Sequence, residues 1–317
     1  MGLDVEALYR HRKHEDVRLG IEEEFLVPEI GAGRTVAVLT RPLGPAAPVG
    51  WVVCHAFGIE QIHLERLDVL AARALAAAGF PTLRFHGQGY GDSDLEMDAI
   101  SLTSHRNEAR DAVDLLRDEA GVERVGVAGA RLGGTVAAMV AEELSLPFLV
   151  MWEPVVNGAQ YVSELVRSHA LFTLMSDGGD VQTVMRAVRE DLASQGWADV
   201  KGFRLTRAAT EDIGAVDLTS AISTFSGASL LMALSRTGKP SRSLSGLAQK
   251  LASLGPSTFE VVQDSVAPGF GQFRWHAADG GRSKKDTQLE LNERMVAMTA
   301  EWATSRFSAS NGRKAAP

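Results

Sequence analysis

Cysteine is nearly absent from this chain of 317 residues, in which Cys54 is the only one. A single thiol excludes an intramolecular disulfide and a metal site built from paired cysteines. Aromatic residues make up only 6% of the chain, and no apolar run reaches the length of a membrane span. The first residues, Met1 to Asp16, carry charges where a signal peptide needs an apolar run. These absences predict a cytoplasmic protein without a membrane anchor.

Positive charge is also in short supply. The chain has 32 Lys and Arg against 40 Asp and Glu, a formal net charge of −8. This balance argues against nucleic-acid binding and against a basic membrane-binding face. The motifs H-E-x-x-H and the P-loop are missing as well, so we expect neither a metal nor a cofactor. Small molecules or proteins remain as partners, and a homodimer stays open.

The apolar segments alternate between strand-like and helix-like patterns. Strand patterns lie at 17–28, 34–42, 50–55, 80–85, 125–127, 147–152, 228–235 and 258–263, and helical patterns at 61–78, 100–120, 135–143, 244–254 and 286–306. Strands that alternate with helices favour a parallel sheet. The sequence thus predicts an α/β protein: an eight-stranded, mostly parallel sheet with helices on both faces, opened by an antiparallel hairpin. The acidic run Glu22 to Glu24 is expected on the solvated face of that hairpin.

The alternation is interrupted once. Residues 158–215 carry two helical patterns and a short extended piece, which indicate a cap inserted between the two parts of the core, 17–157 and 216–307. Residues 308–317 are small, polar and basic, and we expect them to form a disordered tail.

The stretch V-G-V-A-G-A-R-L-G-G, Val125 to Gly134, predicts a strand, a tight turn and a helix. Small residues around one protruding side chain are typical of a nucleophile elbow, usually G-x-S-x-G. Here the central position holds Arg131, which stays protonated and has no lone pair with which to attack. At a helix N-terminus, Arg131 is instead suited to hold an anion, unless an internal acid neutralises it.

Three further stretches carry a family resemblance: H-A-F-G-I-E at 55–60, F-H-G-Q-G-Y-G-D-S at 85–93 and M-W-E-P-V-V-N-G at 151–158. With the elbow, they resemble the α/β-hydrolase superfamily, and more narrowly a bacterial group of serine-aminopeptidase-like and exosortase-associated hydrolases. The resemblance covers roughly residues 17–307. Some members of that group also carry arginine at the elbow. The resemblance implies an α/β-hydrolase fold with a helical cap and a site above the elbow.

The resemblance also implies roles for single residues. Phe57 and Leu132 occupy the positions whose backbone N–H groups form an oxyanion hole. His276, between the last strand and the final helix, stands where a triad histidine is expected, and the alternative is an exposed loop histidine. Glu153 ends the sixth strand, where some relatives carry the triad acid, and it is the expected internal partner of Arg131. The usual acid after the seventh strand is missing from S-R-T-G-K-P-S-R at 235–242.

Two functions remain at this stage. The first is a hydrolase or acyl-transfer enzyme for a small anionic ester, thioester or amide, with Arg131, His276 and Glu153 in its site and without a recognisable triad. The second is an inactive pseudo-hydrolase that binds a small anionic ligand or a pathway partner. Cys54 lies in a predicted buried strand and is expected to be packing. Glu60, Gln61, His63 and Glu65 lie at the start of the first long helix. Most of them are expected on its solvated face, although the earliest could reach the crevice.

Overall fold

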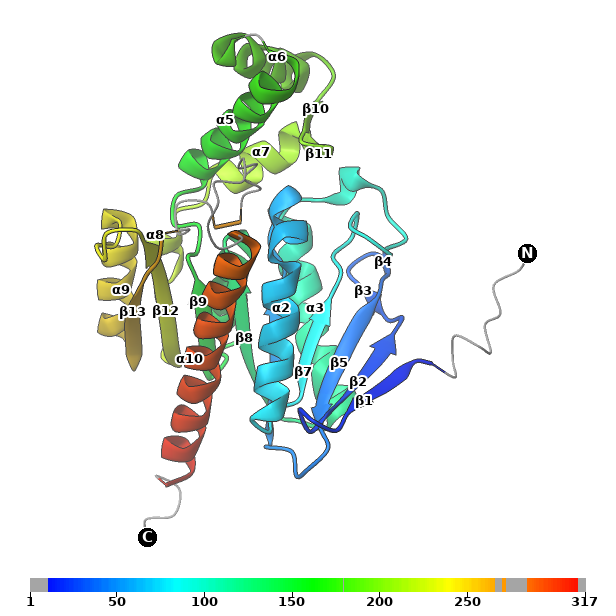
Figure 1. The fold of residues 1–317 in the computed structure, drawn as a ribbon, viewed down its shortest axis with the longest axis vertical. Helices are drawn as coiled ribbons and strands as arrows, with labels where there is room; N and C mark the ends of the chain where they lie inside the picture. The colour runs from blue at the N-terminus through cyan, green and yellow to red at the C-terminus, as the bar shows by residue number, and fades with distance from the viewer. Residues whose placement is uncertain (1–10, 179, 266–269, 272–283, 313–317) are drawn as a thin grey trace, which may run out of the picture.

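The computed structural model describes residues 11–178, 180–265, 270–271 and 284–312. Within them, one sheet has the strand order β1-β2-β5-β7-β6-β8-β9-β12-β13 (Figure 1). Neighbours pair in parallel from β7 to β13, and β1, β2, β5 and β7 pair antiparallel. The predicted mostly parallel sheet is confirmed. Its strands are β1 (Lys13–Asp16), β2 (Ile21–Leu26), β5 (Ala37–Pro42), β6 (Val49–Cys54), β7 (Thr82–Phe85), β8 (Arg124–Ala130), β9 (Phe148–Trp152), β12 (Ala228–Ser235) and β13 (Ser257–Gln263); β3 (Glu29–Ile30) and β4 (Gly33–Arg34) pair separately.

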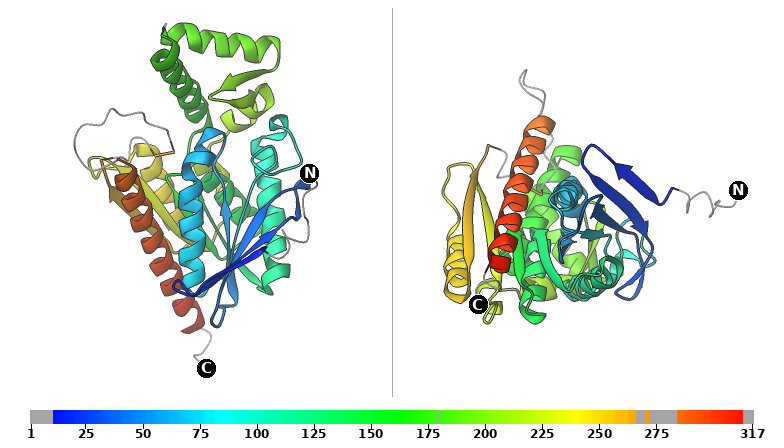
Figure 2. Two further views of the ribbon diagram at one scale, coloured as in Figure 1. Left: turned by 45° about the vertical axis from the view of Figure 1, so that its right-hand side comes forward. Right: turned by 90° about the horizontal axis from the view of Figure 1, so that it is seen from below.

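Helices cover both faces of this sheet (Figures 1 and 2). In β8, Val125 and Val127 pack in one core layer with α3 and α4, while Ala128 and Ala130 pack in the other with α2 and α10. A strand buried on both faces has no polar side to show, which explains its continuous apolar sequence. The covering helices are α2 (Ile59–Ala77), α3 (Leu102–Ala120), α4 (Leu132–Glu143), α9 (Arg242–Leu254) and α10 (Lys284–Gly312). A short 3-10 turn, η1 (Met97–Ala99), precedes α3.

In the described part of the chain the sheet has nine strands, one more than the eight predicted. The additional strand is β1, whose sequence K-H-E-D shows no apolar alternation. It pairs antiparallel with β2, and Lys13 Nζ lies 3.0 Å from Glu22 Oε1 across the pair. An exposed edge strand held by backbone bonds and charges carries no hydrophobic signal from which to predict it.

The sequence predicted that the acidic run on β2, Glu22 to Glu24, lies on a solvated face. This prediction is wrong for Glu23 and Glu24. Glu23 and Glu24 are only 5% and 4% exposed. Arg73 of α2 donates two hydrogen bonds to Glu23, at 2.6 and 3.1 Å. Arg41 of β5 and Arg12 pair with Glu24. Buried carboxylates are tolerated here because each one is paired with arginine.

An insertion follows β9 and lies above one end of the sheet (Figure 1). It consists of α5 (Gly158–Asp177), α6 (Val181–Ser194), the hairpin β10 (Trp197–Val200) and β11 (Phe203–Thr206), and α7 (Arg207–Gly214). The short helix α8 (Leu218–Ala221) leads back to the core. Helix α7 was not predicted from the sequence; its N-cap residue, Thr206, accepts a hydrogen bond from the N–H of Ala209 at 3.0 Å.

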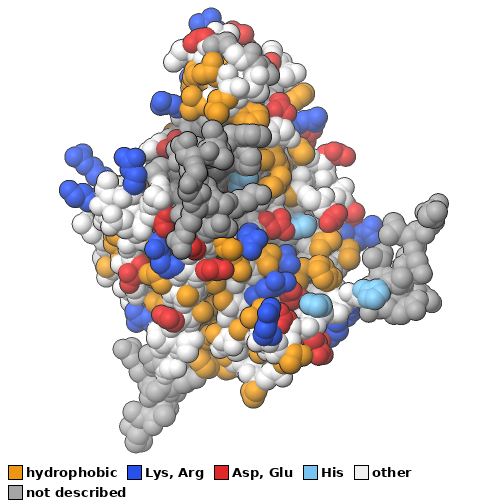
Figure 3. Space-filling model, in the orientation of Figure 1, with side chains coloured by type: hydrophobic (Ala, Val, Ile, Leu, Met, Phe, Trp, Pro, Cys, Tyr) orange, Lys and Arg blue, Asp and Glu red, His pale blue; other side chains and the backbone are white. Residues whose placement is uncertain are grey.

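The surface mixes charged and apolar side chains. Figure 3 shows acidic and basic groups interspersed over α2 and α10, and hydrophobic side chains on the insertion. In α5, Leu171, Phe172 and Met175 are exposed. The last helix, α10, continues to Gly312, into the segment for which a disordered tail was expected. Among the described helices, none has the length and hydropathy needed to cross a bilayer.

Candidate functional site

A sharp turn joins β8 to α4, as the sequence predicted, and we call residues 129–133 the β8–α4 turn. Arg131 sits at its apex with φ 53° and ψ −125°, a conformation that is costly for a residue with a side chain. Its backbone N–H donates to the carbonyl of Trp152 at 3.0 Å, which ties the apex to the end of β9. The apex therefore projects beyond the carboxyl ends of the parallel strands, where sites form in α/β sheets.

Two glycines make this turn sterically feasible. A Cβ on Gly129 would lie 2.5 Å from the carbonyl carbon of Gly133. A Cβ on Gly133 would lie 2.3 Å from the carbonyl oxygen of Cys54 at the end of β6. Both clashes are with backbone, so neither can be relieved by a rotamer change.

The guanidinium of Arg131 is held by two neighbouring elements. Its Nε donates to Glu60 Oε1 at 3.2 Å, and Glu60 comes from the first turn of α2. Its Cζ lies 5.4 Å from the ring centroid of Tyr161, on α5 of the insertion. The Tyr161 hydroxyl donates to Glu60 Oε2 at 2.8 Å. We call these residues the Glu60–Arg131–Tyr161 cluster; it joins the core to the insertion.

Electrostatics favour the charged form of the arginine. Burial opposes that charge, but the carboxylate of Glu60 and the other nearby acids outweigh burial and raise the pKa of Arg131. The side chain of Glu60 is only 2% exposed. Burial raises the pKa of Glu60, while the guanidinium and the Tyr161 hydroxyl pull it back. A buried pair of this kind depends on both partners, because either one alone leaves an uncompensated buried charge or acceptor.

Glu153 is not the partner that the sequence analysis had expected for Arg131. Its Oε2 accepts a hydrogen bond from the backbone N–H of Leu234 at 2.5 Å, which ties the end of β9 to β12. Burial raises the pKa of Glu153, and the Leu234 N–H and Arg131 moderate that rise. The second ion pair of Arg131 is with Glu164 of α5, at 3.7 Å.

A polar cavity of about 510 Å³ opens beside the cluster. One wall is formed by the end of β9 and the start of α5. The other is formed by the β12–α9 loop and the first turn of α9. Its charged lining residues are Arg131, Glu153, Glu164, Arg236 and Lys239. This combination suits a small, polar and charged ligand, because a few convergent charged groups fix the orientation of a bound molecule.

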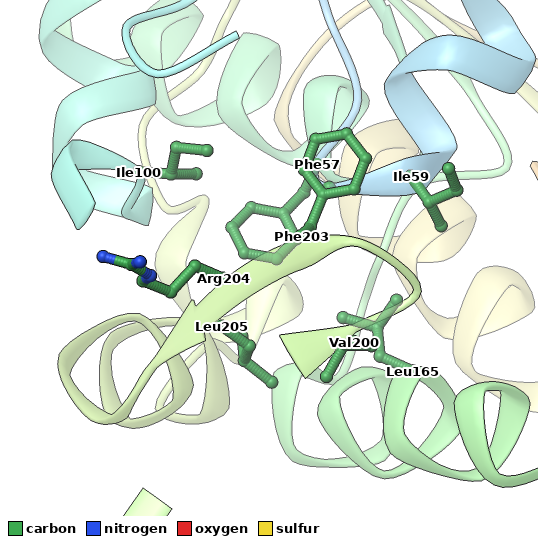
Figure 4. Close-up of a pocket in the computed structure, with 9 residues that line it drawn as sticks. Phe57, Ile59, Ile100, Leu165, Val200, Phe203, Arg204 and Leu205 are labelled. Carbon is green, nitrogen blue, oxygen red and sulfur yellow. The ribbon is translucent and has the colours of Figure 1, made fainter. Parts of the chain in front are cut away.

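Phe57 lines a different cavity, which is apolar and measures only about 20 Å³. Figure 4 shows Phe57 facing Phe203 of β11, with Ile100 and Leu165 nearby. Leu132 is buried and begins α4, so its backbone N–H has no partner within that helix. Phe57 and Arg131 are not brought into one cavity, and the oxyanion role of Phe57 and Leu132 stays a prediction.

A second buried polar cluster lies behind Phe57. The imidazole rings of His55 and His105 are 4.5 Å apart, and His55 Nε2 lies 3.6 Å from Glu108 Oε2. Burial, with the neighbouring His55, lowers the pKa of His105 to about 4. The nearby Tyr90 hydroxyl accepts a hydrogen bond from the N–H of Gly58 at 2.7 Å. This cluster supports the loop that begins α2.

Two other predicted residues have different outcomes. Cys54 is buried in β6, as expected, and burial raises the pKa of its thiol, which makes it a poor nucleophile. His276 lies outside the described residues. Among the described side chains, no group of three or more His, Cys, Asp or Glu is arranged to hold a metal ion.

Tyr161 and Glu164 were not predicted as site residues from the sequence, and Glu60 was predicted only as one of several residues at the start of a helix. A topological signal was present for Glu60. Since β6 and β8 pair in parallel, the turns that follow them lie side by side, and Glu60 follows β6 as Arg131 follows β8. Tyr161 and Glu164 depend on how the insertion folds back, which no local pattern specifies.

No protein-family model matches this chain, and neither does any curated protein. Solved structures do. Est1E from Butyrivibrio proteoclasticus, with ferulic acid bound, is 15% identical with a TM-score of 0.60, over 89% of this chain and 99% of that one. The esterase Pf2001 from Pyrococcus furiosus is 12% identical with a TM-score of 0.58, over 93% and 96%. Proline iminopeptidase from Mycobacterium smegmatis is 16% identical with a TM-score of 0.53, over 90% and 100%. At these identities the likeness is one of fold, and the chain has the α/β-hydrolase fold that its motifs predicted.

Proposed function

We propose that this protein binds a small charged ligand in the polar cavity beside Arg131 and does not perform serine acyl transfer. The proposal rests on one observation. The residue at the apex of the β8–α4 turn is an arginine whose guanidinium is engaged by Glu60 and Tyr161. A protonated guanidinium has no lone pair, so it cannot form the covalent intermediate on which serine hydrolases depend.

The environment of Arg131 also bears on how a ligand binds. Glu60 matches its charge, and Glu164 lies 3.7 Å away, so the guanidinium offers little unbalanced positive charge to an anion. The cavity holds two further cations, Arg236 and Lys239, on its opposite wall. An anionic group of the ligand is therefore better served by the β12–α9 loop than by Arg131, which acts as part of the cavity wall.

A second candidate is an enzyme that hydrolyses an ester, thioester or amide without a covalent intermediate. Glu153 favours it, because this carboxyl lines the cavity and has a raised pKa, which brings it closer to the working range of a general base. In this mechanism Glu153 would take a proton from a water that attacks the substrate carbonyl. The protonated Glu153 would then give that proton to the leaving group as its bond to the carbonyl carbon breaks.

One set of measurements distinguishes the two functions. The protein is mixed with coenzyme A thioesters, acyl phosphates, p-nitrophenyl esters and simple carboxylates, and both turnover and the melting temperature are recorded. Binding without catalysis predicts ligands that raise the melting temperature and no turnover above that of Glu153→Gln. Turnover that disappears in Glu153→Gln would replace the first proposal with the second. A fluorophosphonate probe is expected to label no serine of the native protein.

A further inference from the structure

We propose that the polar cavity selects a dipolar ligand, one that carries a primary ammonium group and, at its other end, a carboxylate or phosphate. This inference rests on the proposed binding function and adds the chemical class of the ligand. It comes from the distribution of charge over the two walls of the cavity, which have opposite signs.

The wall built by β9 and α5 is acidic. It contains Arg131, but Glu60 already neutralises that guanidinium from outside the cavity lining. Glu153 and Glu164 are thus in excess on this wall. Each carboxylate has about four acceptor sites. Glu153 accepts one hydrogen bond, from the Leu234 N–H. Glu164 accepts one at Oε1, from Gln160 Nε2 at 2.8 Å, and its Oε2 lies 3.7 Å from Arg131 Nη2. Acceptor capacity for an ammonium group remains on both.

The wall built by the β12–α9 loop is basic. Arg236 and Lys239 line it, and within the described part of the chain neither forms an ion pair with an acidic side chain. The loop itself is held in shape by Ser235, whose Oγ donates to the carbonyl of Lys239 at 2.7 Å and accepts from the N–H of Thr237 at 3.2 Å. An anionic group can therefore be met by two cations carried on a fixed backbone.

The size of the cavity and the charges that line it together restrict the class of ligand that fits. The cavity volume of about 510 Å³ lies within the range of about 300–1,000 Å³ that is usual for small-molecule sites. A ligand with only negative charge would face Glu153 and Glu164 across this space, and one with only positive charge would face Arg236 and Lys239. Like charges brought together discriminate against both. A ligand with both charges finds a partner at each wall.

Calorimetric titration of the intact protein tests the inference. The probes are 6-aminohexanoate, its monopolar counterparts hexanoate and hexylamine, and phosphoethanolamine as the phosphate-bearing dipole. At least one dipolar probe is expected to bind tenfold or more tightly than both hexanoate and hexylamine. The stronger of the two dipoles identifies the anionic group as carboxylate or phosphate. Equal binding of a monopolar probe, or no binding by any probe, would overturn the inference.

Charge-removing variants assign the two walls. Lys239→Met and Glu164→Gln should each lower the affinity for the dipolar probe at least threefold. Lys239→Met should not lower the affinity for hexylamine. The matched controls are Lys250→Met in α9 and Glu190→Gln in α6, which do not line the cavity and should leave affinity within twofold. A dipolar probe that is insensitive to Glu164→Gln and Glu153→Gln would contradict the acidic wall.

Failure of this inference is distinguishable from failure of the proposed function. If the protein binds hexanoate and 6-aminohexanoate alike and turns over nothing, only the dipolar preference is wrong. If it hydrolyses esters, the non-catalytic function is wrong whatever the charge preference of the cavity. Turnover is therefore measured on the same preparations that are titrated.

Discussion

At the scale of single residues, the role of Arg131 depends on the carboxylate of Glu60, which is buried away from water. Glu60 is 2% exposed on its side chain, and its Oε1 and Oε2 are met by Arg131 and by the Tyr161 hydroxyl. Removing one partner of such a pair is costly because the other stays buried and charged, whereas removing both can be nearly neutral. Arg131 therefore has two roles: it compensates the buried charge of Glu60, and it lines the cavity.

We expect Arg131→Ala to lower the free energy of unfolding by roughly 3–5 kcal/mol, the usual cost of breaking a buried ion pair. Urea denaturation followed by circular dichroism measures it. The double variant Arg131→Met with Glu60→Gln should recover most of that loss, because no buried carboxylate is left unpaired. An exposed arginine of α6, Arg189, gives the control, and Arg189→Ala should change stability by less than about 0.5 kcal/mol. A double variant no more stable than Arg131→Ala would argue against coupling through Glu60.

His105 makes a separate residue-scale prediction, about pH. Burial lowers its pKa to about 4, so the folded protein binds fewer protons here than the unfolded chain, whose histidine has a pKa near 6.5. Its contribution to stability is present above pH 6.5 and is lost as the pH falls towards 4. At about 1.4 kcal/mol per pKa unit, the loss between pH 7 and pH 5 is about 2 kcal/mol.

The measurement is the free energy of unfolding at both pH values for the wild type and His105→Gln. The variant should lose less stability on acidification, by about 2 kcal/mol, since glutamine keeps a donor for the Ser101 carbonyl but does not titrate. Equal pH dependence in the two proteins would show that His105 is not the group involved.

At the scale of elements, most of the fold was predictable and the residue pairings were not. The core strands and helices followed from apolar runs and spacing, because burial on both faces of β6, β8 and β9 leaves a strong sequence signal. The edge strand β1 and the short helix α7 carry no such signal. Glu23 and Glu24 look solvated in sequence because their arginine partners are distant along the chain. The same reason hid Tyr161, which reaches Arg131 only through the folding of the insertion.

The β8–α4 turn offers a test at this scale with a matched control. We expect Gly133→Ala to destabilise the fold severely, because the new Cβ would lie 2.3 Å from the Cys54 carbonyl oxygen and 2.6 Å from that of His55. In contrast, Gly246 is inside α9, and a Cβ added there would have no atom within 4 Å, so Gly246→Ala should stabilise by roughly 0.5–1 kcal/mol. Thermal melts of the two variants measure this. Similar melting temperatures for both would contradict the close packing of the turn against β6.

At the scale of the whole molecule, the fold does not determine which reaction the site performs. The chain shares its architecture with esterases and a peptidase. The serine triad that the α/β-hydrolase resemblance implies would take its groups from the turn after β8, the loop after β12 and the loop before α10. The first holds Arg131, and the second, residues 235–242, contains no acid. The likeness therefore supports a site at this position without supplying its reaction.

Because the fold does not supply the reaction, we predict that placing a serine at position 131 does not create serine hydrolase activity. Arg131→Ser combined with Glu60→Gln keeps the cavity without a buried unpaired carboxylate, and it places a hydroxyl at the apex of the turn. We expect no stoichiometric labelling by a fluorophosphonate, because no acid after β12 is present to orient a histidine base. Intact-mass spectrometry measures the labelling, with a known serine esterase as the positive control. If the variant were labelled, and if His276→Ala then abolished the labelling, a histidine base would be present after all, and the arginine alone would account for the absence of serine chemistry.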